Sequence, residues 1–228
     1  MATWKVFPLR GAFRTHSCSR SCCWKRPAWQ QHCPPRRHHR AAEPTGQGIR
    51  MAEQQSPFFL RPPSPADLER VLDWMQAPAV YRWFDFGQGR QRLNAVALGV
   101  MARSPQYCMR VFGERGDGTA LGIVVLAEVQ HPFGSASFWV ARDPGRRAYR
   151  GITEDAARAL LMEGFGRLGR RSINAWAVET NHRSLRLLNA LGFRPYGVQQ
   201  ACHELDGRLL GRVHFELLAP APTDSTAP

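Results

Sequence analysis

The chain has 228 residues and a formal net charge of +13; 43% of its residues are hydrophobic and 21% are charged. This composition excludes an intrinsically disordered chain and is sufficient for one folded domain with a tail. No apolar run approaches the roughly 18 residues that cross a bilayer, so we expect no membrane association.

The first fifty residues carry most of this charge, +9, whereas the remaining 178 residues carry +4. The net charge of the whole chain is therefore weak evidence for nucleic-acid binding by its folded part. Four of the six cysteines also lie in the first fifty residues, and their pattern does not resemble a secreted disulfide framework. We therefore expect a reducing, cytoplasmic location.

Residues 1–55 form a basic extension, rich in Cys and His, that we interpret in four ways. In the first interpretation, translation starts at Met51 and the upstream stretch is not part of the native protein. In the second, the stretch is an organellar transit peptide, because it is rich in Arg and nearly free of acid. In the third, it is a disordered basic tail. In the fourth, it binds zinc through Cys18, Cys22, Cys33 and His38 or His39, although this spacing matches no recognised ligand pattern.

The predicted domain begins with one strand and two helices. Residues 58–61 are an apolar strand, and two prolines stop it. The stretch from Ser64 to Asp67 then starts a helix whose apolar residues continue to Met75 at helical spacing. Pro78 ends this run. A second amphipathic stretch predicts a helix over residues 90–101.

The rest of the chain changes from a meander of strands to alternating helices and strands. The predicted elements are strands at 107–112, 121–129 and 136–141, a helix at 151–168, a strand at 172–178, a helix at 181–191, and strands at 196–203 and 208–217. Such an order predicts a single α+β domain over residues 56–218, with a central mixed, mostly antiparallel sheet flanked by helices. We expect a parallel strand pair around the long helix and a disordered tail over residues 219–228.

A basic loop from Asp143 to Thr153 opens the long helix. Four arginines lie in or next to it, and Gly151 lets a ligand approach the backbone. A helix N-terminus has unpaired N–H groups that attract phosphate. The loop is therefore either a pyrophosphate cradle or a solvated basic cap.

The second motif runs from Asn181 to Phe193, with Ser184 three residues after Asn181. Read locally, it is a well-capped helix start that ends at Gly192. The motif gains weight from its combination with the basic loop, which precedes it at a suitable distance in the sequence with one predicted strand between them.

Together, the two motifs resemble the GNAT superfamily of N-acetyltransferases, specifically the branch that acetylates ribosomal-protein and other N-terminal amines (RimJ/RimL-like). The stretch from Asn181 to Phe193 matches that branch almost letter for letter, and Asp206-Gly207 follows as a hairpin turn. The first motif departs from the branch, because Ala148 replaces a leading Arg or Gln and Thr153 replaces a small residue.

This resemblance implies an enzyme that transfers the acetyl group of acetyl-CoA directly to a primary amine, with no metal. The acceptor is a protein N-terminus or a small-molecule amine, and the enzyme is a monomer or a homodimer. Ser184 would lie near the thioester sulfur as a general acid. The implied coenzyme site comprises Trp139, Val140, Arg147, Arg150, Gly151, Ile152, Thr153 and Asn181.

The reaction needs a base that takes a proton from the amine. Glu128 is our candidate, because it ends an apolar strand where burial would raise its pKa; the alternative is an outward-facing strand acid. Glu179 and His131 are further candidates. The superfamily implies an acceptor pocket at Tyr81, Arg82, Trp83 and Asp85, although the aromatic residues there could instead pack the core.

Two other functions compete with acetyl transfer. The departures at Ala148 and Thr153 suggest a coenzyme-A-binding module without activity. The basic first fifty residues suggest nucleic-acid binding, whose affinity would depend steeply on salt and vanish when they are deleted.

Overall fold

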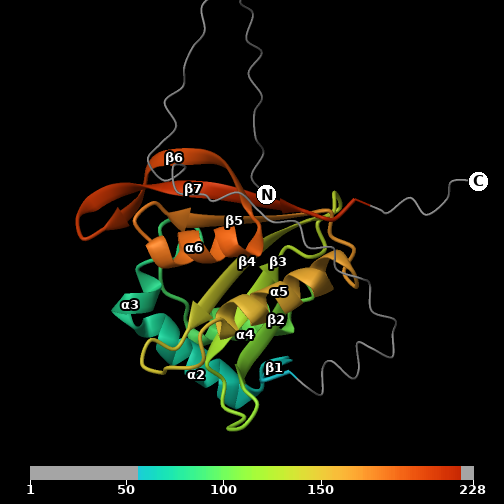
Figure 1. The fold of residues 1–228 in the computed structure, drawn as a ribbon. Coiled ribbons are helices and arrows are strands. Elements are labelled where there is room, and N and C mark those ends of the chain that lie inside the picture. Colours follow the sequence, from blue (N-terminus) through green and yellow to red (C-terminus); the bar gives the residue numbers. More distant parts are fainter. Residues whose placement is uncertain (1–55, 222–228) are drawn as a thin grey trace, which may run out of the picture. The chain divides into compact units, whose positions relative to one another are not determined.

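A computed structural model describes residues 56–221 of the chain, so the expectations for residues 1–55 and for residues 222–228 lie outside the described part. The described residues form a seven-stranded sheet covered by helices (Figure 1). The strands are β1 (Phe58–Arg61), β2 (Tyr107–Glu114), β3 (Gly122–Ala127), β4 (Ser135–Arg142), β5 (Ser172–Val178), β6 (Arg194–Leu205) and β7 (Arg208–Leu218). The helices are α2 (Pro65–Gln76), α3 (Pro78–Tyr81), α4 (Ala95–Arg103), α5 (Ile152–Phe165) and α6 (His182–Leu191).

The strands follow the order β1-β2-β3-β4-β5-β7-β6 across the sheet. All neighbours are antiparallel except β4 and β5, which are parallel and are joined through α5. The predicted α+β class, the mixed and mostly antiparallel sheet and the parallel pair around the long helix are all confirmed. A parallel pair needs such a crossover, and α5 provides it between β4 and β5.

A capping box fixes the start of α2. The Ser64 side chain accepts from the amide of Asp67, and the Asp67 carboxylate accepts from the amide of Ser64. Arg61 of β1 also bonds this carboxylate, at 2.5 Å. Burial alone would raise the pKa of Asp67, but the hydrogen bonds from Arg61 and Ser64 outweigh it and lower that pKa to about 2. This carboxylate ties β1 to the first helix.

The two largest errors among the predicted boundaries are in helices. The second helix begins at Ala95 instead of residue 90, because the Asn94 side chain accepts from the amide of Ala97 and caps the helix there. Helix α5 ends at Phe165 instead of Leu168, with Gly166 as its C-cap. Pro78 does not only end a run, since it also starts the short helix α3, where a proline suits the first turn.

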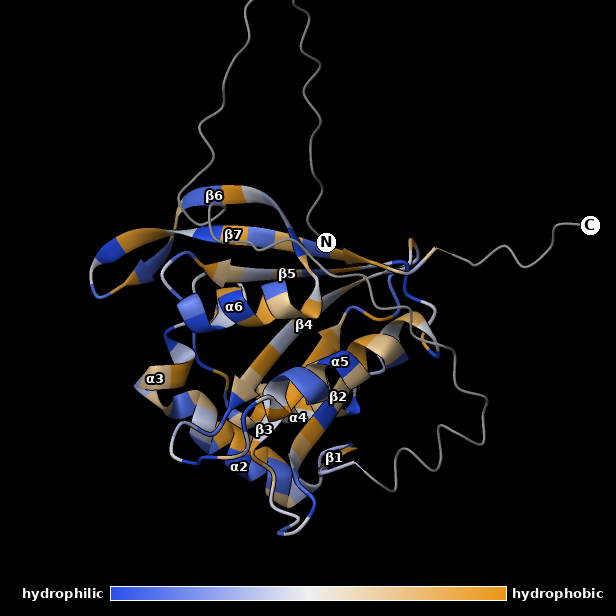
Figure 2. Ribbon diagram, viewed as in Figure 1, coloured by the Kyte–Doolittle hydropathy of each residue, from blue (hydrophilic) through white to orange (hydrophobic). Residues whose placement is uncertain are grey.

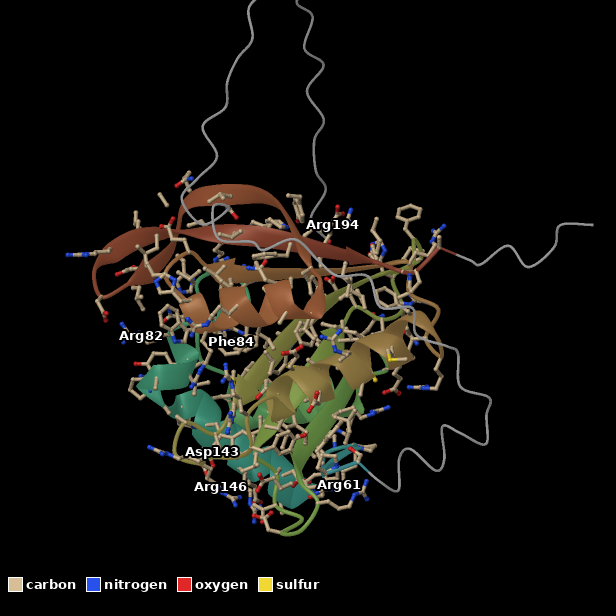
Figure 3. All side chains as sticks on the ribbon, viewed as in Figure 1. Arg61, Arg82, Phe84, Asp143, Arg146 and Arg194 are labelled. Atoms are coloured by element: carbon tan, nitrogen blue, oxygen red, sulfur yellow. The ribbon has the colours of Figure 1, made fainter. Side chains whose placement is uncertain are left out.

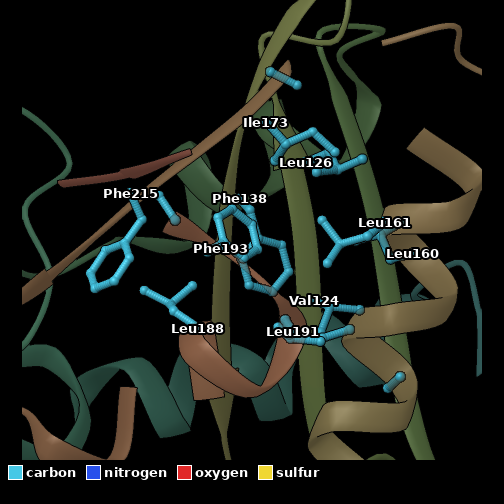
Figure 4. Packing of buried hydrophobic residues seen from close by; sticks show 14 of the residues in the cluster. Val124, Leu126, Phe138, Leu160, Leu161, Ile173, Leu188, Leu191, Phe193 and Phe215 are labelled. Atoms are coloured by element: carbon cyan, nitrogen blue, oxygen red, sulfur yellow. The ribbon is translucent and has the colours of Figure 1, made fainter. Parts of the chain in front are cut away.

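Two hydrophobic clusters lie on opposite faces of the sheet. One packs α5 and α6 against the strands and includes Phe138, Leu160 and Phe193 (Figure 4). The other packs α2 and α4 against β2 and β3 and includes Met75 and Ile123. Figure 2 shows hydrophobic colours concentrated in the central strands. Among the described helices, none combines the length and apolarity that a membrane crossing needs.

Candidate active site

A gap opens in the middle of the sheet between β4 and β5. The two strands pair only where Ser135–Ser137 lies against Ser172–Asn174. Beyond these pairs, β4 continues to Arg142 and β5 to Val178 while the strands diverge (Figure 1). The gap is part of a cleft of about 1150 Å³. Each strand therefore presents one edge to the cleft without a strand partner.

Backbone groups of both strands point into this gap. The amide of Asp143 donates to Leu121 on the β3 side (2.9 Å), and the alternation of a strand then directs the N–H and C=O of Val140 the opposite way, toward the gap. At the end of β5, the amide of Glu179 bonds β7, so the backbone of Trp176 also faces the gap. An extended ligand with amide groups can pair with these edges as an added strand.

The N-terminus of α5 lies at the same cleft. Its N-cap, Gly151, has a φ of +107°, a left-handed conformation that favours glycine. The first bond of the helix runs from the amide of Asp155 to the carbonyl of Gly151, so the amides of Thr153 and Glu154 precede it and have no partner in the helix. The Glu154 carboxylate is paired with Arg158 at 2.7 Å. The helix end therefore still offers N–H groups to an anion.

Four arginines line the cleft: Arg142, Arg150, Arg183 and Arg186. Among the described residues, none of the four forms an ion pair with a carboxylate. Burial, and then the charge of Arg183, lower the pKa of Arg142, whose buried Nε has no hydrogen-bond partner. A bound anion would relieve this repulsion. Arg183 and Arg186 are not among the residues predicted from the sequence, although they lie inside the second motif.

Helix α6 contributes a polar pair from its first turn. The Oδ1 atom of Asn181 accepts from the amide of Ser184 at 3.2 Å, which caps the helix. Within the described residues, the Nδ2 group of Asn181 and the hydroxyl of Ser184 make no other hydrogen bond, and both residues line the cleft. These groups are free to donate to a ligand in the gap.

The other end of the cleft has what we call the aromatic wall, formed by Trp83, Phe84, Phe86, Trp139 and Trp176. The rings of Phe84 and Phe86 stack at 5.3 Å, and each meets Trp139 edge to face, at 5.8 and 5.9 Å. Figure 3 shows Phe84 beside α3 and below α6. The mutual packing of these rings gives the wall a shape before any ligand binds.

An anchoring network holds the loop that carries this wall. Asp85 pairs with Arg212 of β7 at 2.7 Å, and both side chains are only 14% exposed. His203 lies between Arg212, 3.2 Å from its Nδ1, and the carbonyl of Arg82, 2.8 Å from its Nε2. Since that carbonyl can only accept, Nε2 carries the proton. Arg82 also pairs with Asp206 at the hairpin tip, so the loop is tied to β6 and β7.

The structure brings most of the predicted site residues together. The predicted residues that line the cleft are Trp83, Asp85, Trp139, Val140, Arg150, Gly151, Thr153, Asn181 and Ser184. Five others, Glu128 among them, do not line it. Tyr81 packs under the Arg92 guanidinium, and Arg82 belongs to the anchoring network. Ile152 is fully buried in the core, and Arg147 is exposed outside the cleft.

The expected burial of Glu128 is wrong. Its side chain is exposed, because the chain leaves β3 at Ala127 and turns there with a left-handed φ of 59° at Glu128. The carboxylate accepts from the Ser137 hydroxyl at 3.1 Å and does not line the cleft. Glu179 and His131 are also engaged elsewhere, with the amide of Gly211 and the ring of Phe133 respectively.

His214 of β7 is a titratable cleft residue that the sequence did not indicate. It is opposite Trp176 in the strand register and lines the cleft. Its ring nitrogens make no hydrogen bond with the described residues, and its ring lies 6.0 Å from that of Tyr196. Burial, and then the charge of Arg212, lower its pKa below 6.5. Its imidazole is therefore neutral at neutral pH and can accept a proton. A lone histidine in a strand gives no signal until the register places it.

Comparison with known proteins agrees with this geometry. Residues 58–194 match the model of the acetyltransferase (GNAT) domain. A spermidine N-acetyltransferase from Vibrio cholerae, solved in complex with CoA and spermine, superposes with a TM-score of 0.63 at 17% identity, over 72% of this chain and 96% of that one. A GNAT-family acetyltransferase from Bacillus anthracis gives 0.58 at 16% identity, over 72% and 96%.

No curated protein sequence matches the chain significantly. The two solved structures show the likeness of the fold, and the domain model shows the family, because its match covers more than half of the sequence. The chain belongs to the GNAT family of acetyltransferases.

Proposed function

We propose that this protein transfers the acetyl group of acetyl-CoA to a primary amine while both are bound in the cleft. The observation that carries the proposal is the coincidence, in one cleft, of an unpaired strand edge, a helix N-terminus and four arginines without carboxylate partners. The pantetheine amides would pair with the backbone of Val140, and the pyrophosphate would sit at the amides of Gly151 and Thr153. The Vibrio cholerae neighbour, solved with CoA, supports this arrangement.

The chemistry follows from the groups that face the gap. The neutral amine attacks the thioester carbonyl, a C–N bond forms, and the C–S bond breaks. The amide of Val140 points into the gap and can stabilise the oxyanion. The free hydroxyl of Ser184 can protonate the leaving thiolate. The amine proton goes to His214, whose free imidazole lines the cleft; Glu128 is the alternative base.

The finer assignment follows the sequence resemblance. The match from Asn181 to Phe193 favours the RimJ/RimL-like branch, and therefore a protein N-terminus or a small molecule as the source of the amine. The protein would act as a monomer or a homodimer in the cytoplasm.

Calorimetry with CoA tests the coenzyme site. We expect Arg142→Ala to weaken CoA binding by about tenfold or more, because a charge-assisted hydrogen bond contributes about 1.5–3 kcal/mol. Arg147→Ala is the matched control, since this exposed arginine of the same loop does not line the cleft. Equal affinities for both variants would contradict the proposed site.

Thiol release in the presence of an amine panel tests the transfer. Release that depends on both acetyl-CoA and an amine supports the enzyme. Tight CoA binding without release from any amine would instead indicate the coenzyme-A-binding module.

A further inference from the structure

The acceptor end of the cleft is mainly aromatic. Five large rings form the aromatic wall, and Tyr196 and His214 line the cleft as well. The wall lies next to the gap, since Trp139 and Trp176 belong to the two strands that diverge there. An amine that reaches the thioester therefore has its substituent among rings, where an apolar or aromatic group gains from burial.

Two carboxylates near this end, those of Asp85 and Asp206, are already paired. Asp85, which lines the cleft between Phe84 and Phe86, bonds Arg212. Burial alone would raise the pKa of Asp85, but the hydrogen bonds from Arg212 and the amide of Gly87 outweigh burial and lower it. The guanidinium of Arg212 lies 4.3 Å from the ring centre of Trp176 and occupies one face of that ring. Neither the carboxylate nor this ring face is left for a second cation.

A smaller pocket of about 340 Å³ adjoins this end, beside Asp85 and Arg212. It adds the carboxylates of Glu204 and Asp206, and Asp206 is paired with Arg82. Among the described residues that line this smaller pocket, Glu204 is thus the one carboxylate without an ion-pair partner. At the other end of the cleft, the two acids are Asp143 and Glu154, beside the four arginines.

These charges discriminate between classes of amine. A polyamine keeps at least two positive charges after its reacting nitrogen becomes neutral, and each charge needs a carboxylate when it leaves water. At the acceptor end, the guanidinium of Arg212 already lies over the Trp176 ring, and Asp85 and Asp206 are already paired, so further positive charge is disfavoured there. A monoamine loses its single charge on reaction and leaves only its apolar body to be buried.

We infer that the acceptor is a primary monoamine that carries an aromatic or large apolar group near its nitrogen, and that polyamines are poor substrates. This inference rests on the proposed function and narrows it. The chemistry is shared by arylalkylamines and by peptides whose first residue is apolar.

The test compares four acceptors: 2-phenylethylamine, a peptide with an N-terminal Phe, butylamine and spermidine. We expect kcat/KM for at least one of the aromatic amines to exceed that for spermidine by tenfold or more. Whichever of the two aromatic substrates has the higher kcat/KM shows whether the amine comes from an arylalkylamine or from a peptide N-terminus. A kcat/KM for spermidine equal to or above both aromatic values overturns the inference.

Two further measurements separate this inference from the proposed function. Titration of the CoA-bound protein with the same amines reports acceptor binding even when no acetyl transfer occurs. Tighter binding of 2-phenylethylamine than of spermidine supports the inference whatever the turnover; tighter binding of spermidine, or no binding of either aromatic amine, overturns it. Tight binding of an aromatic amine without turnover contradicts only the proposed function.

A variant of the wall gives a second readout. Phe84→Leu keeps an apolar side chain but removes one aromatic face, so the preference for 2-phenylethylamine over butylamine should fall about fivefold. Phe133→Leu is the control, because Phe133 is 76% exposed and does not line the cleft. An unchanged preference in Phe84→Leu counts against the aromatic wall as the acceptor site.

Discussion

At the scale of single residues, some polar side chains that line the cleft have no hydrogen-bond partner in the described structure, and others are held in ion pairs. The hydroxyl of Ser184 and the ring nitrogens of His214 make no hydrogen bonds with the described residues, whereas Asp85 is held by Arg212. A proton acceptor must be within reach of the amine and must not be neutralised by a neighbour. His214 lines the cleft and has no charged partner that neutralises it, whereas Asp85 fails the second condition.

The pH dependence of the rate tests this assignment. Burial, and then the charge of Arg212, disfavour the imidazolium and lower the pKa of His214 from its ordinary value, which favours the neutral base at pH 7. We expect kcat/KM to fall as pH drops through that pKa, and His214→Gln to lose about 100-fold in kcat together with the acidic limb.

Glu128→Gln serves as the comparison in the same assay. If Glu128 is only an exposed acid bonded to Ser137, its variant keeps both the rate and the pH profile. A large loss in Glu128→Gln, with His214→Gln unaffected, would reverse the two roles.

At the scale of elements, the loop before α5 prepares the helix end for an anion. The chain enters the helix through the left-handed Gly151, and this turn leaves the next amides uncovered. A side chain at such a φ is strained even where space exists, and the nearest atom to an added Cβ is 3.9 Å away, on Asp155. The left-handed φ therefore requires a glycine at position 151, whereas the space around it would admit a larger residue.

Gly151→Ala is accordingly expected to lower the free energy of unfolding by about 1–2 kcal/mol and to weaken CoA binding as the turn relaxes. Chemical denaturation and calorimetry measure the two effects. Gly116→Ala is a suitable control, since an added Cβ there has open space and no left-handed φ. A stable Gly151→Ala with full CoA affinity would contradict the role of this turn.

At the scale of the whole molecule, three residue pairs join the two halves of the sheet directly across β4 and β5. A ligand that pairs with both open edges would complete the sheet. We expect saturating CoA to raise the melting temperature and to slow hydrogen exchange at the amides of Val140 and Trp176 more than at the core amide of Ile123. Uniform slowing over all three would argue against binding in the gap.

Hydrophobic periodicity and turn residues were enough to predict the sheet and the parallel pair, and the two motifs drew attention to the segments that line the cleft. These features depend on local patterns such as Gly151 and the run from Asn181 to Phe193. The residues that were predicted wrongly or missed depend on contacts between segments far apart in the sequence. Strand β3 ends at Ala127, one residue before Glu128, so the glutamate is not held in the strand where we expected it to be buried. His214 reaches the cleft only because β7 pairs with β5. No local pattern reports such a pairing.

The anchoring network has a consequence for how the protein can diverge. Asp85 and Arg82 lie within the stretch that matches the GNAT domain model, which ends at residue 194, whereas His203, Asp206 and Arg212 lie beyond it. The loop that shapes the acceptor end is thus braced by a hairpin outside the matched region. Under the proposed function, substitutions in that hairpin would change the choice of amine without touching the coenzyme site, so the two halves of the reaction could evolve separately.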